Sequence, residues 1–529
     1  MSNVPVPKPH RRLRALPYYW QAVIVTIIGS FMVMLDTTVV NIALPRIITV
    51  FGADVHSSQF VLTFYMLALA IIMPATGYLT DTYGTKRIYL LSMLFFTIGS
   101  FLCSAAWSVP SLVVFRVLQG LGGGMLMPLS MTIIFKTVPP EKRGTVMGVF
   151  GLPMLLGPVL GPTLGGYLVE YVDWRFIFTL NLPVGALGLL LGATLLRETE
   201  TRAGLKTDVK GFLFSGTGFA ALLYALSEAP AEGWDDPFIV SLLTLGGVCL
   251  LAWLWTELTV DEPLVDLRVF RSGTYSLATF INFIITTGLF SSMFLLPIFL
   301  QNFRGLGAME TGILMMPQAL ASTITMPLSG KLYDRFGPRP VVAVGLLGLA
   351  FSTWELTFLN LDTSNADVTR VLVERGLSMG LTMMPIMTVA MSSIPPELIA
   401  RSSSLTNVLR QVFGSFGTAI FATLLSTRQT FHQALLTQMV TPDRLSVQAT
   451  LASVQQYLSH NGLSVVQAKG LTVAALYKQV VMSASVTAFQ DCFFVAALIC
   501  LVAVIPTLLL RVKPGLAGGR QHPRQMATD

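Results

Sequence analysis

The chain has 529 residues, of which 53% are hydrophobic and only 12% are charged. A water-soluble domain carries about 25% charged residues, so this composition excludes a soluble protein and indicates that most of the chain faces a lipid bilayer. The net charge of +7 does not call for nucleic acid, because surplus Lys and Arg in a membrane protein gather in cytoplasmic loops. We therefore expect no nucleic-acid partner.

The predicted elements are apolar segments long enough to cross a membrane. At about 20 residues per spanning helix, they predict an all-α integral membrane protein with about fourteen transmembrane helices. The first apolar run follows a basic tail, residues 1–16. It is too long for a signal peptide and lacks a small-residue cleavage site, so we expect an uncleaved span. In chain order the spans are predicted near 17–39, 57–79, 87–107, 110–133, 145–168, 175–196, 210–228, 238–257, 274–301, 311–331, 340–360, 368–392, 404–425 and 487–510.

The basic residues predict the orientation of these spans. With the N-terminus in the cytoplasm, most of the 34 Lys and Arg residues fall in the tails or in loops on the same side. The positive-inside rule then places both tails, 1–16 and 511–529, in the cytoplasm and favours an even number of spans. The four cysteines lie in apolar stretches and no CxxC or Cys/His cluster occurs, so we expect no structural metal.

An internal repeat divides the chain into two halves. The loop after the second span and a loop in the second half share Gly, Asp, Gly and a basic residue at the same spacing: Gly77, Asp81, Gly84, Lys86 and Arg87 in the first copy, and Gly330, Asp334, Arg335, Gly337 and Arg339 in the second. Parallel repeats of this kind occur in secondary transporters. We predict a six-helix half over 17–200, an inserted helix pair with linkers over 201–260, and a second six-helix half over 261–510.

One long outer segment, 427–485, interrupts the second half before the last span. It is mildly amphipathic, with a helix start at Thr441-Pro442-Asp443 and a break at Asn461-Gly462. Two interpretations stay open for this segment. It is either a helical hairpin on the outer face of the membrane or a docking surface for a partner.

The repeated loop resembles the cytoplasmic gate motif of the major facilitator superfamily. A tight loop at Gly84 lets Asp81 meet a helix N-terminus or an arginine of a neighbouring span, and this ionic latch would hold the inner gate closed. An ordinary charged turn would explain one copy but not two at matching positions. The resemblance implies the major facilitator fold, here two six-helix halves plus two inserted helices.

Two further spans carry motifs of the same family. Burying an arginine inside a membrane span costs free energy, so such a residue needs a partner. Arg116, followed by Gln119 and Gly120, resembles the family's span-four arginine that is associated with proton coupling. The alternative is an arginine with a purely structural role. Span five is rich in Gly and Pro and resembles the motif that separates exporters from importers, the alternative being a generic packing face. Its motif residues are Gly151, Gly157, Pro158, Gly161, Pro162 and Gly165.

Motifs in the first and sixth spans indicate which subfamily the chain resembles. The stretch from Asp36 through Asn41 to Pro45, and the stretch from Trp174 to Pro183, resemble the fourteen-span drug:proton antiporters of the EmrB/QacA type. With the two halves, the inserted pair and the long outer loop, the resemblance covers almost the whole chain. It implies a proton-coupled exporter of hydrophobic or amphiphilic drugs in a bacterial inner membrane.

The proton carrier is predicted to be a carboxylate. No Walker A sequence is present, so we expect an ion gradient rather than ATP or another cofactor to supply the energy. All five histidines fall outside the predicted spans. Among carboxylates in the core spans, Asp36 is the best placed, with Arg116 as one candidate neighbour and Glu374 next in line. Further candidates for the cavity or for coupling are Asn41, Gln119, Arg375, Arg410 and Asp491. Separate salt bridges explain Glu374 and Arg375 equally well, and Asp491 fits the outer end of the last span.

These predictions define a proton:drug antiporter that works by alternating access. If the organism has two membranes, the outer segment would dock a periplasmic adaptor leading to an outer-membrane channel. One alternative is a dedicated exporter of a single metabolite, such as a siderophore, a fatty acid or a self-made antibiotic. A membrane enzyme is disfavoured because no HxxxD or HExxH occurs, and a channel is disfavoured by the duplicated gate motif.

Overall fold

The computed structural model describes residues 16–53, 55–201, 208–260, 262–440, 445–460 and 464–510, and all of their regular secondary structure is helical. Most of both predicted tails, Thr441-Pro442-Asp443 and Asn461-Gly462 lie outside these residues. The main helices are α2 (Tyr18–Phe51), α3 (Val55–Ile72), α4 (Ala75–Tyr83), α5 (Thr85–Ser104), α6 (Val109–Thr137), α7 (Arg143–Phe150), α8 (Leu152–Tyr171), α9 (Phe176–Thr179), α10 (Asn181–Leu195), α11 (Val209–Glu232), α12 (Pro237–Thr259), α13 (Gly273–Ile298), α14 (Ala308–Phe336), α15 (Pro338–Glu355), α16 (Asn365–Ser392), α17 (Ile399–Met439), α18 (Leu445–His460), α19 (Val465–Val502) and α20 (Val504–Leu508).

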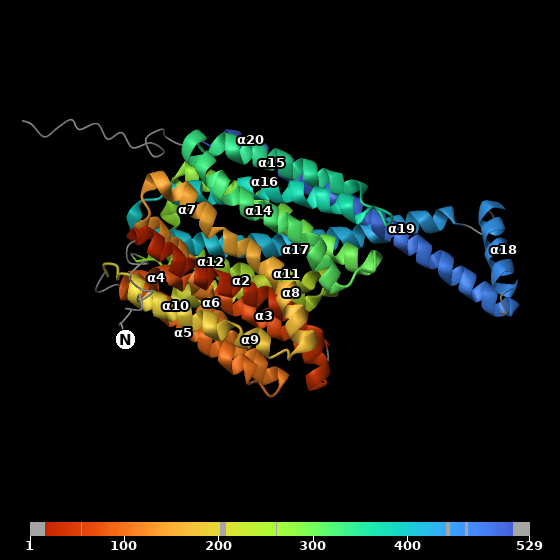
Figure 1. The fold of residues 1–529 in the computed structure, drawn as a ribbon, viewed down its shortest axis with the longest axis horizontal. Helices are drawn as coiled ribbons and strands as arrows, with labels where there is room; N and C mark the ends of the chain where they lie inside the picture. The colour runs from red at the N-terminus through yellow and green to blue at the C-terminus, as the bar shows by residue number, and fades with distance from the viewer. Residues whose placement is uncertain are drawn as a thin grey trace, which may run out of the picture.

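The helices form one elongated bundle whose long axis follows the helix axes (Figure 1). Within the described residues, ten helices are long and apolar enough to cross a membrane, or eleven if α3 and α4, bent by 53° at their junction, count as one span. The structure therefore confirms a helical multi-pass protein but not the predicted number of fourteen. Helices α8, α14 and α16 also lie in this bundle, but they are not among the helices counted as long and apolar enough to cross a membrane. In α16 the charged residues Asp367, Arg370, Glu374 and Arg375 follow one another within nine positions.

Each half packs around its own core. In the first half α2 contacts α6, α8 and α10, and α5 lies against α6. Gly122 explains the last contact, because a Cβ there would lie 2.5 Å from the backbone nitrogen of Phe96. In the second half α14 packs on α16 and α17 packs on α13 and α19. Small residues at such crossings let membrane helices approach closely.

The inserted helices lie at the junction of the two halves. Helix α11 packs against α3 of the first half and α17 of the second, and α12 packs mainly on α11. Asp236 caps α12 by accepting hydrogen bonds from the amides of Phe238 (2.8 Å) and Ile239 (3.2 Å). Of the inserted pair, α11 is the helix that packs on both halves.

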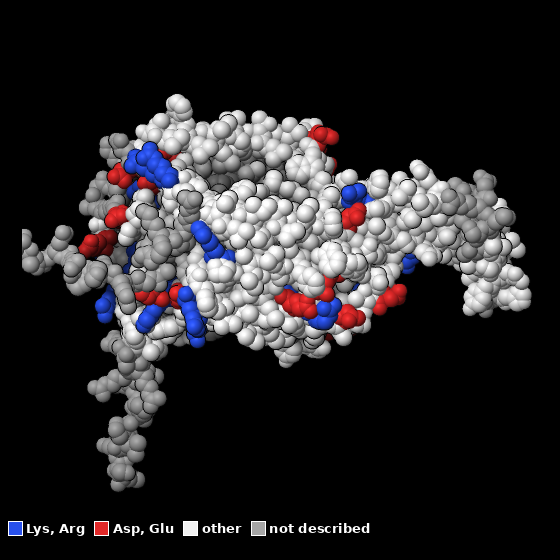
Figure 2. Space-filling view, turned by 90° about the horizontal axis from the view of Figure 1, so that it is seen from above, with Lys and Arg blue, Asp and Glu red and all other residues white. Residues whose placement is uncertain are grey.

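Helices α17 and α19 continue well beyond the bundle, and α18 stands beside the start of α19 at the tip (Figure 1). These helices account for the described part of the predicted outer segment. Charged residues gather at the two ends of the bundle, and a broad uncharged surface separates them (Figure 2). We call the end that carries Lys86, Arg87, Arg335 and Arg339 the basic end, and the end from which α17 and α19 project the opposite end.

Candidate functional site

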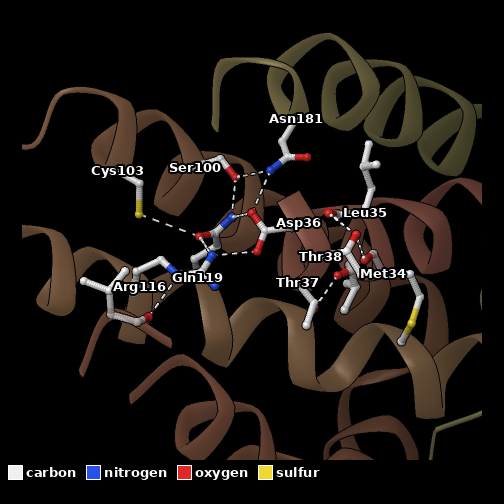
Figure 3. Close-up of polar contacts among 12 residues, drawn as sticks. Met34, Leu35, Asp36, Thr37, Thr38, Ser100, Cys103, Arg116, Gln119 and Asn181 are labelled. Carbon is white, nitrogen blue, oxygen red and sulfur yellow. Dashed lines mark hydrogen bonds and ion pairs between the residues drawn. The ribbon is translucent and has the colours of Figure 1, made fainter. Parts of the chain in front are cut away.

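A buried ion pair lies inside the first half, where α2 faces α6. Arg116 on α6 donates from Nη1 to Oδ2 of Asp36 on α2 at 2.6 Å, and both side chains are fully buried (Figure 3). The structure thus brings Asp36 together with the residue that the sequence offered as one candidate neighbour. A buried pair of this kind is strongly destabilised when one partner is removed, because the other charge is left without compensation.

Neutral donors complete the surroundings of the carboxylate. Gln119 Nε2 donates to Asp36 Oδ1 at 2.8 Å, and Asn181 Nδ2 donates to the same oxygen at 3.0 Å. The Gln119 and Asn181 amides also contact Ser100 Oγ, at 2.6 and 3.2 Å (Figure 3). Side chains of α6 and α10 therefore meet at the carboxylate on α2, and Ser100 of α5 joins them through the two amides. Gly99 allows this approach, since a Cβ there would lie 2.6 Å from Cα of Gln119.

The guanidinium of Arg116 is held on its other side by α3. Its carbon lies 3.7 Å from the ring centroid of Tyr65, a cation–π contact, and its Nε donates to the carbonyl of Val61 at 3.4 Å. Within the described residues its Nη2 has no hydrogen-bond partner. No part of the pair is exposed, so bulk solvent does not contact Asp36 in this conformation.

The sequence did not single out Ser100, Tyr65 or Asn181 as site residues. Asn181 is the one with a usable signal, because it is an amide in an apolar span and falls in the stretch from Trp174 to Pro183. Ser100 and Tyr65 resemble ordinary residues of a membrane helix, and only the fold places them. Asn41, by contrast, is exposed on α2, and none of the hydrogen bonds described above involves it.

The other candidate carboxylates lie elsewhere. Glu374 shares the guanidinium of Arg370 with Glu355, at 2.9 and 3.0 Å, and about a third of its side chain is exposed. Asp491 on α19 meets two residues of α17, His432 at 2.7 Å and Arg428 at 3.5 Å. These clusters belong to the second half, and neither contains a residue of the Asp36 network.

The second half also buries an arginine. Arg375 on α16 is only 3% exposed and donates to Thr353 Oγ1 at 2.6 Å. Unlike Arg116, it forms no ion pair within the described residues. Arg410 on α17 donates to Asn407 Oδ1 at 3.3 Å. No group of three or more His, Cys, Asp and Glu side chains in the described part of the chain could hold a metal ion.

The first gate loop reaches across to the second half at the basic end. Asp81 Oδ2 lies 3.5 Å from Arg401 Nε, and Arg401 Nη2 lies 3.1 Å from Oε2 of Glu262, in the linker that follows the inserted pair. Gly77 lets α4 approach, since a Cβ there would lie 2.8 Å from Cα of Arg401. Arg401 therefore ties the first half to the start of α17 and to the linker.

The second gate loop reaches in the other direction. Asp334 at the end of α14 accepts hydrogen bonds from the amides of Gly144 (3.2 Å) and Thr145 (3.1 Å) and from Thr145 Oγ1 (2.9 Å). It thus caps the first turn of α7, where a carboxylate is favoured by the free amides. A Cβ on Gly330 would lie 2.8 Å from Cα of Thr145, so the two halves touch closely here.

The remaining gate-motif residues shape the two loops. Gly84 and Gly337 have φ of +94° and +80°, which favour glycine. The amides of Lys86 and Arg87 donate to the carboxylate of Glu198 at 3.0 and 3.2 Å. Arg335 is exposed and lies over the ring of Phe336. Among the described residues of this motif, Asp81 and Asp334 are the two for which the structure gives polar links between the halves.

The glycines of the fifth-span motif pack directly on α2 around Asp36. A Cβ on Gly157 would lie 2.7 Å from Met34 Cβ, and one on Gly165 would lie 3.1 Å from Val39 Cγ1, while Thr38 Oγ1 donates to the Gly157 carbonyl at 3.0 Å. Gly161 faces Thr38, and Gly151 faces Met326 and Met384 of the second half. Pro158 and Pro162 lie on α8 between these glycines. Movement of α8 relative to the second half would therefore be transmitted to the helix that carries Asp36.

Replacing Arg401 with Ala is expected to open the basic end, because this change removes both carboxylate contacts that the arginine makes. The measurement is the rate at which a maleimide labels Cys introduced by Ser403→Cys, since Ser403 is buried between the halves and donates to the Pro128 carbonyl at 2.8 Å. Labelling should be severalfold faster. The exposed Arg335→Ala serves as the matched control, and an unchanged rate with Arg401→Ala would show that Arg401 does not hold this end closed.

Comparison with solved structures shows where a similar fold occurs. The fold is similar to that of the human organic anion transporter MFSD10, with a TM-score of 0.60, 16% identity, and coverage of 93% of this chain and 100% of that one. The two proteins thus share a fold of helices arranged in one bundle.

Sequence comparison identifies the family. The family model described as Major Facilitator Superfamily matches residues 26–418, and the chain belongs to that superfamily of transporters. It is 35% identical over 489 residues to the uncharacterized MFS-type transporter YhcA of Bacillus subtilis, covering 92% of each chain. It is 37% identical over 412 residues to the multidrug resistance protein B homolog of Mycobacterium tuberculosis, covering 76% of this chain and 75% of the relative.

Proposed function

We propose that the chain is a proton-driven antiporter that exports hydrophobic or amphiphilic drugs and similar toxic compounds. The observation that carries the proposal is the buried Asp36–Arg116 pair at 2.6 Å. Ionisable residues inside membrane spans are costly, and they commonly mark ion pathways or proton relays. The export of drugs is supported by the relative named as a multidrug resistance protein.

In the proposed mechanism Asp36 exchanges its proton as the two ends of the bundle open in turn. With the basic end closed by Asp81 and Asp334, the ionised carboxylate is paired with Arg116 and accepts from Gln119 and Asn181. Opening of the opposite end admits a proton, which neutralises Asp36 and weakens the pair. The membrane potential supplies roughly 2.3 kcal/mol per charge per 100 mV, so each charge carried inward can drive more than a tenfold concentration ratio of cargo.

The proposal includes the finer features that the sequence resemblance implies. We propose that the basic end lies on the cytoplasmic side of a bacterial inner membrane. Counting α7 together with α8 as one span, and α14 and α16 as two more, brings the eleven spans given above to fourteen. We also assign the chain to the EmrB/QacA type. The projecting part of α17, α18 and α19 would then face outward and dock a periplasmic adaptor. Loss of adaptor co-purification on deletion of residues 440–475 from an otherwise folded protein tests that last step.

The test of the proposed function is uptake of a lipophilic dye by everted membrane vesicles under an imposed pH gradient. Vesicles that contain the protein should accumulate the dye while the lumen is acidic, and a protonophore should abolish the accumulation. Vesicles without the protein give the background. Dye movement that persists unchanged after the gradient is collapsed would contradict proton coupling, and no movement with any of a panel of dyes would contradict broad drug export.

A further inference from the structure

The linker that follows the inserted helices is buried in the bundle. Connecting segments usually run over the surface of a protein, but in residues 262–266, which we call the strap, Leu264 and Val265 are each only 1% exposed. Both pack into the main hydrophobic core. Asp266 then accepts a hydrogen bond from the Arg268 amide at 2.9 Å and begins the next helical turn. The strap is therefore a fixed part of the bundle.

A single buried carboxylate fastens the strap to α12. Glu257 accepts a hydrogen bond from Trp253 Nε1 at 2.7 Å, and its two oxygens lie 3.3 and 3.2 Å from the Val265 amide, which donates to them. The indole of Trp253 packs on Phe219 of α11, with ring centroids 5.5 Å apart. Burying a carboxylate or an amide is costly unless it is hydrogen-bonded, so this contact is favoured over its loss. The inserted helices thus set the position of the strap.

The strap places one charged side chain on the gate at the basic end. Arg401 Nη2 donates to Glu262 Oε2 at 3.1 Å, while Arg401 Nε faces Asp81 Oδ2 at the longer distance of 3.5 Å. The side chains of Arg401 and Asp81 are buried, whereas that of Glu262 is 43% exposed. Because a guanidinium is planar and rigid, holding Nη2 also fixes the direction in which Nε points. Glu262 is therefore placed to orient Arg401 toward Asp81.

The inserted helices also contact the two helices that this gate connects. Helix α11 packs on α3, which leads into α4 and Asp81, and on α17, which begins just before Arg401. At the opposite end of the bundle Trp234, between α11 and α12, donates from Nε1 to Thr423 Oγ1 of α17 at 2.9 Å. A movement of α17 away from α4 would therefore have to break contacts with the inserted pair or carry the pair along.

We infer that the inserted helix pair takes part in closing the basic end, with the strap as the link. Glu262 is a positioning residue that holds Arg401 toward Asp81. Glu257 keeps the strap where Glu262 can reach the guanidinium. When the basic end opens, the strap must release Arg401 or follow α17. This role goes beyond the proposed function, since it does not depend on which cargo or ion the protein moves.

The test measures how readily the basic end opens in the full-length protein. A polar maleimide labels Ser403→Cys, a position buried between the halves, and the labelling of protein without this cysteine is subtracted because four native cysteines are present. Glu262→Gln should speed labelling about fivefold, which corresponds to about 1 kcal/mol. Glu141→Gln removes the same charge from an exposed glutamate just before α7. It is the matched control and should leave the rate unchanged.

Combined variants show where each glutamate acts. In protein that already carries Arg401→Ala, Glu262→Gln should add nothing, because its partner is gone. Glu257→Ala should speed labelling on its own but not in protein that carries Glu262→Gln, since it acts through the strap. Glu257→Gln keeps an oxygen that can accept from Trp253 and Val265, so it should label at the wild-type rate. A merely structural role of Glu257 would instead change the rate in both backgrounds.

An unchanged rate with Glu262→Gln would overturn the inference, because Arg401 would then close the basic end without the strap. An equal acceleration by Glu262→Gln with and without Arg401→Ala would also overturn it, because Glu262 would then act on another contact. The side chain of Glu262 is partly exposed, so its replacement should leave the protein folded even where Glu257→Ala does not. Size-exclusion chromatography of each variant checks this.

Discussion

Asp36→Asn is expected to reduce gradient-driven cargo transport to background while the protein stays folded and still binds cargo. The introduced amide keeps the shape of the side chain and an oxygen that can accept from Gln119 and Asn181, but it cannot carry a proton or balance the charge of Arg116. The measurement is dye uptake by everted vesicles under a pH gradient, together with size-exclusion behaviour and dye binding of the purified variant.

Glu374→Gln provides the matched control for this experiment. Glu374 is also a carboxylate in the bundle, but it pairs with Arg370 in a partly exposed cluster of the second half. We expect this variant to retain gradient-driven transport. Full transport by Asp36→Asn, or its loss in Glu374→Gln alone, would move the proton site to the second half.

Arg116→Met is expected to lower the free energy of unfolding by about 3–5 kcal/mol, the usual range when one partner of a buried ion pair is removed. The variant leaves the carboxylate of Asp36 in a fully buried position without its cation. Combining it with Asp36→Asn removes both charges, and replacement of a buried pair by uncharged residues is often close to neutral. The double variant should therefore regain most of the lost stability but none of the transport.

Thermal unfolding of the purified variants in one detergent measures this effect, and Arg335→Met, at an exposed arginine of the basic end, is the control. The stability of the double variant separates two explanations. If it is as unstable as Arg116→Met alone, the arginine stabilises the bundle through its contacts with Tyr65 and Val61 rather than through its charge pair with Asp36.

The sequence predicted the two charged residues of the site, because burying a charge in a membrane span costs free energy. Asp36 and Arg116 stand out because a charge within an apolar span requires a partner, and Arg116 was one candidate partner for Asp36. Ser100, Tyr65 and Asn181 could not be ranked in this way, since single hydroxyl, phenol and amide groups are common in membrane helices. Their convergence around the Asp36–Arg116 pair depends on how α3, α5 and α10 are rotated, which hydropathy does not reveal.

Contacts between the halves were predictable in kind but not in detail. The repeated loop predicted that Asp81 would meet a helix N-terminus or an arginine, and the two copies use different solutions: Asp81 meets Arg401, whereas Asp334 caps α7. The added contact of Glu262 with Arg401 has no signal in the sequence, because it depends on the path of the linker after α12. The predicted spans 404–425 and 487–510 cover only part of their helices, because α17 runs on to Met439 and α19 begins at Val465, inside the segment 427–485.

The most direct test of proton:drug antiport measures the proton that cargo movement should drive. Purified protein is reconstituted into liposomes loaded with ethidium, a permanently charged cargo, and a trapped pH indicator, with potassium and valinomycin clamping the potential and no initial pH difference. Dilution into ethidium-free buffer should acidify the lumen, because each cargo that leaves is exchanged for protons that enter, and Asp36→Asn should give no change. Ethidium efflux through the wild type with a constant or more alkaline lumen would contradict proton:drug antiport.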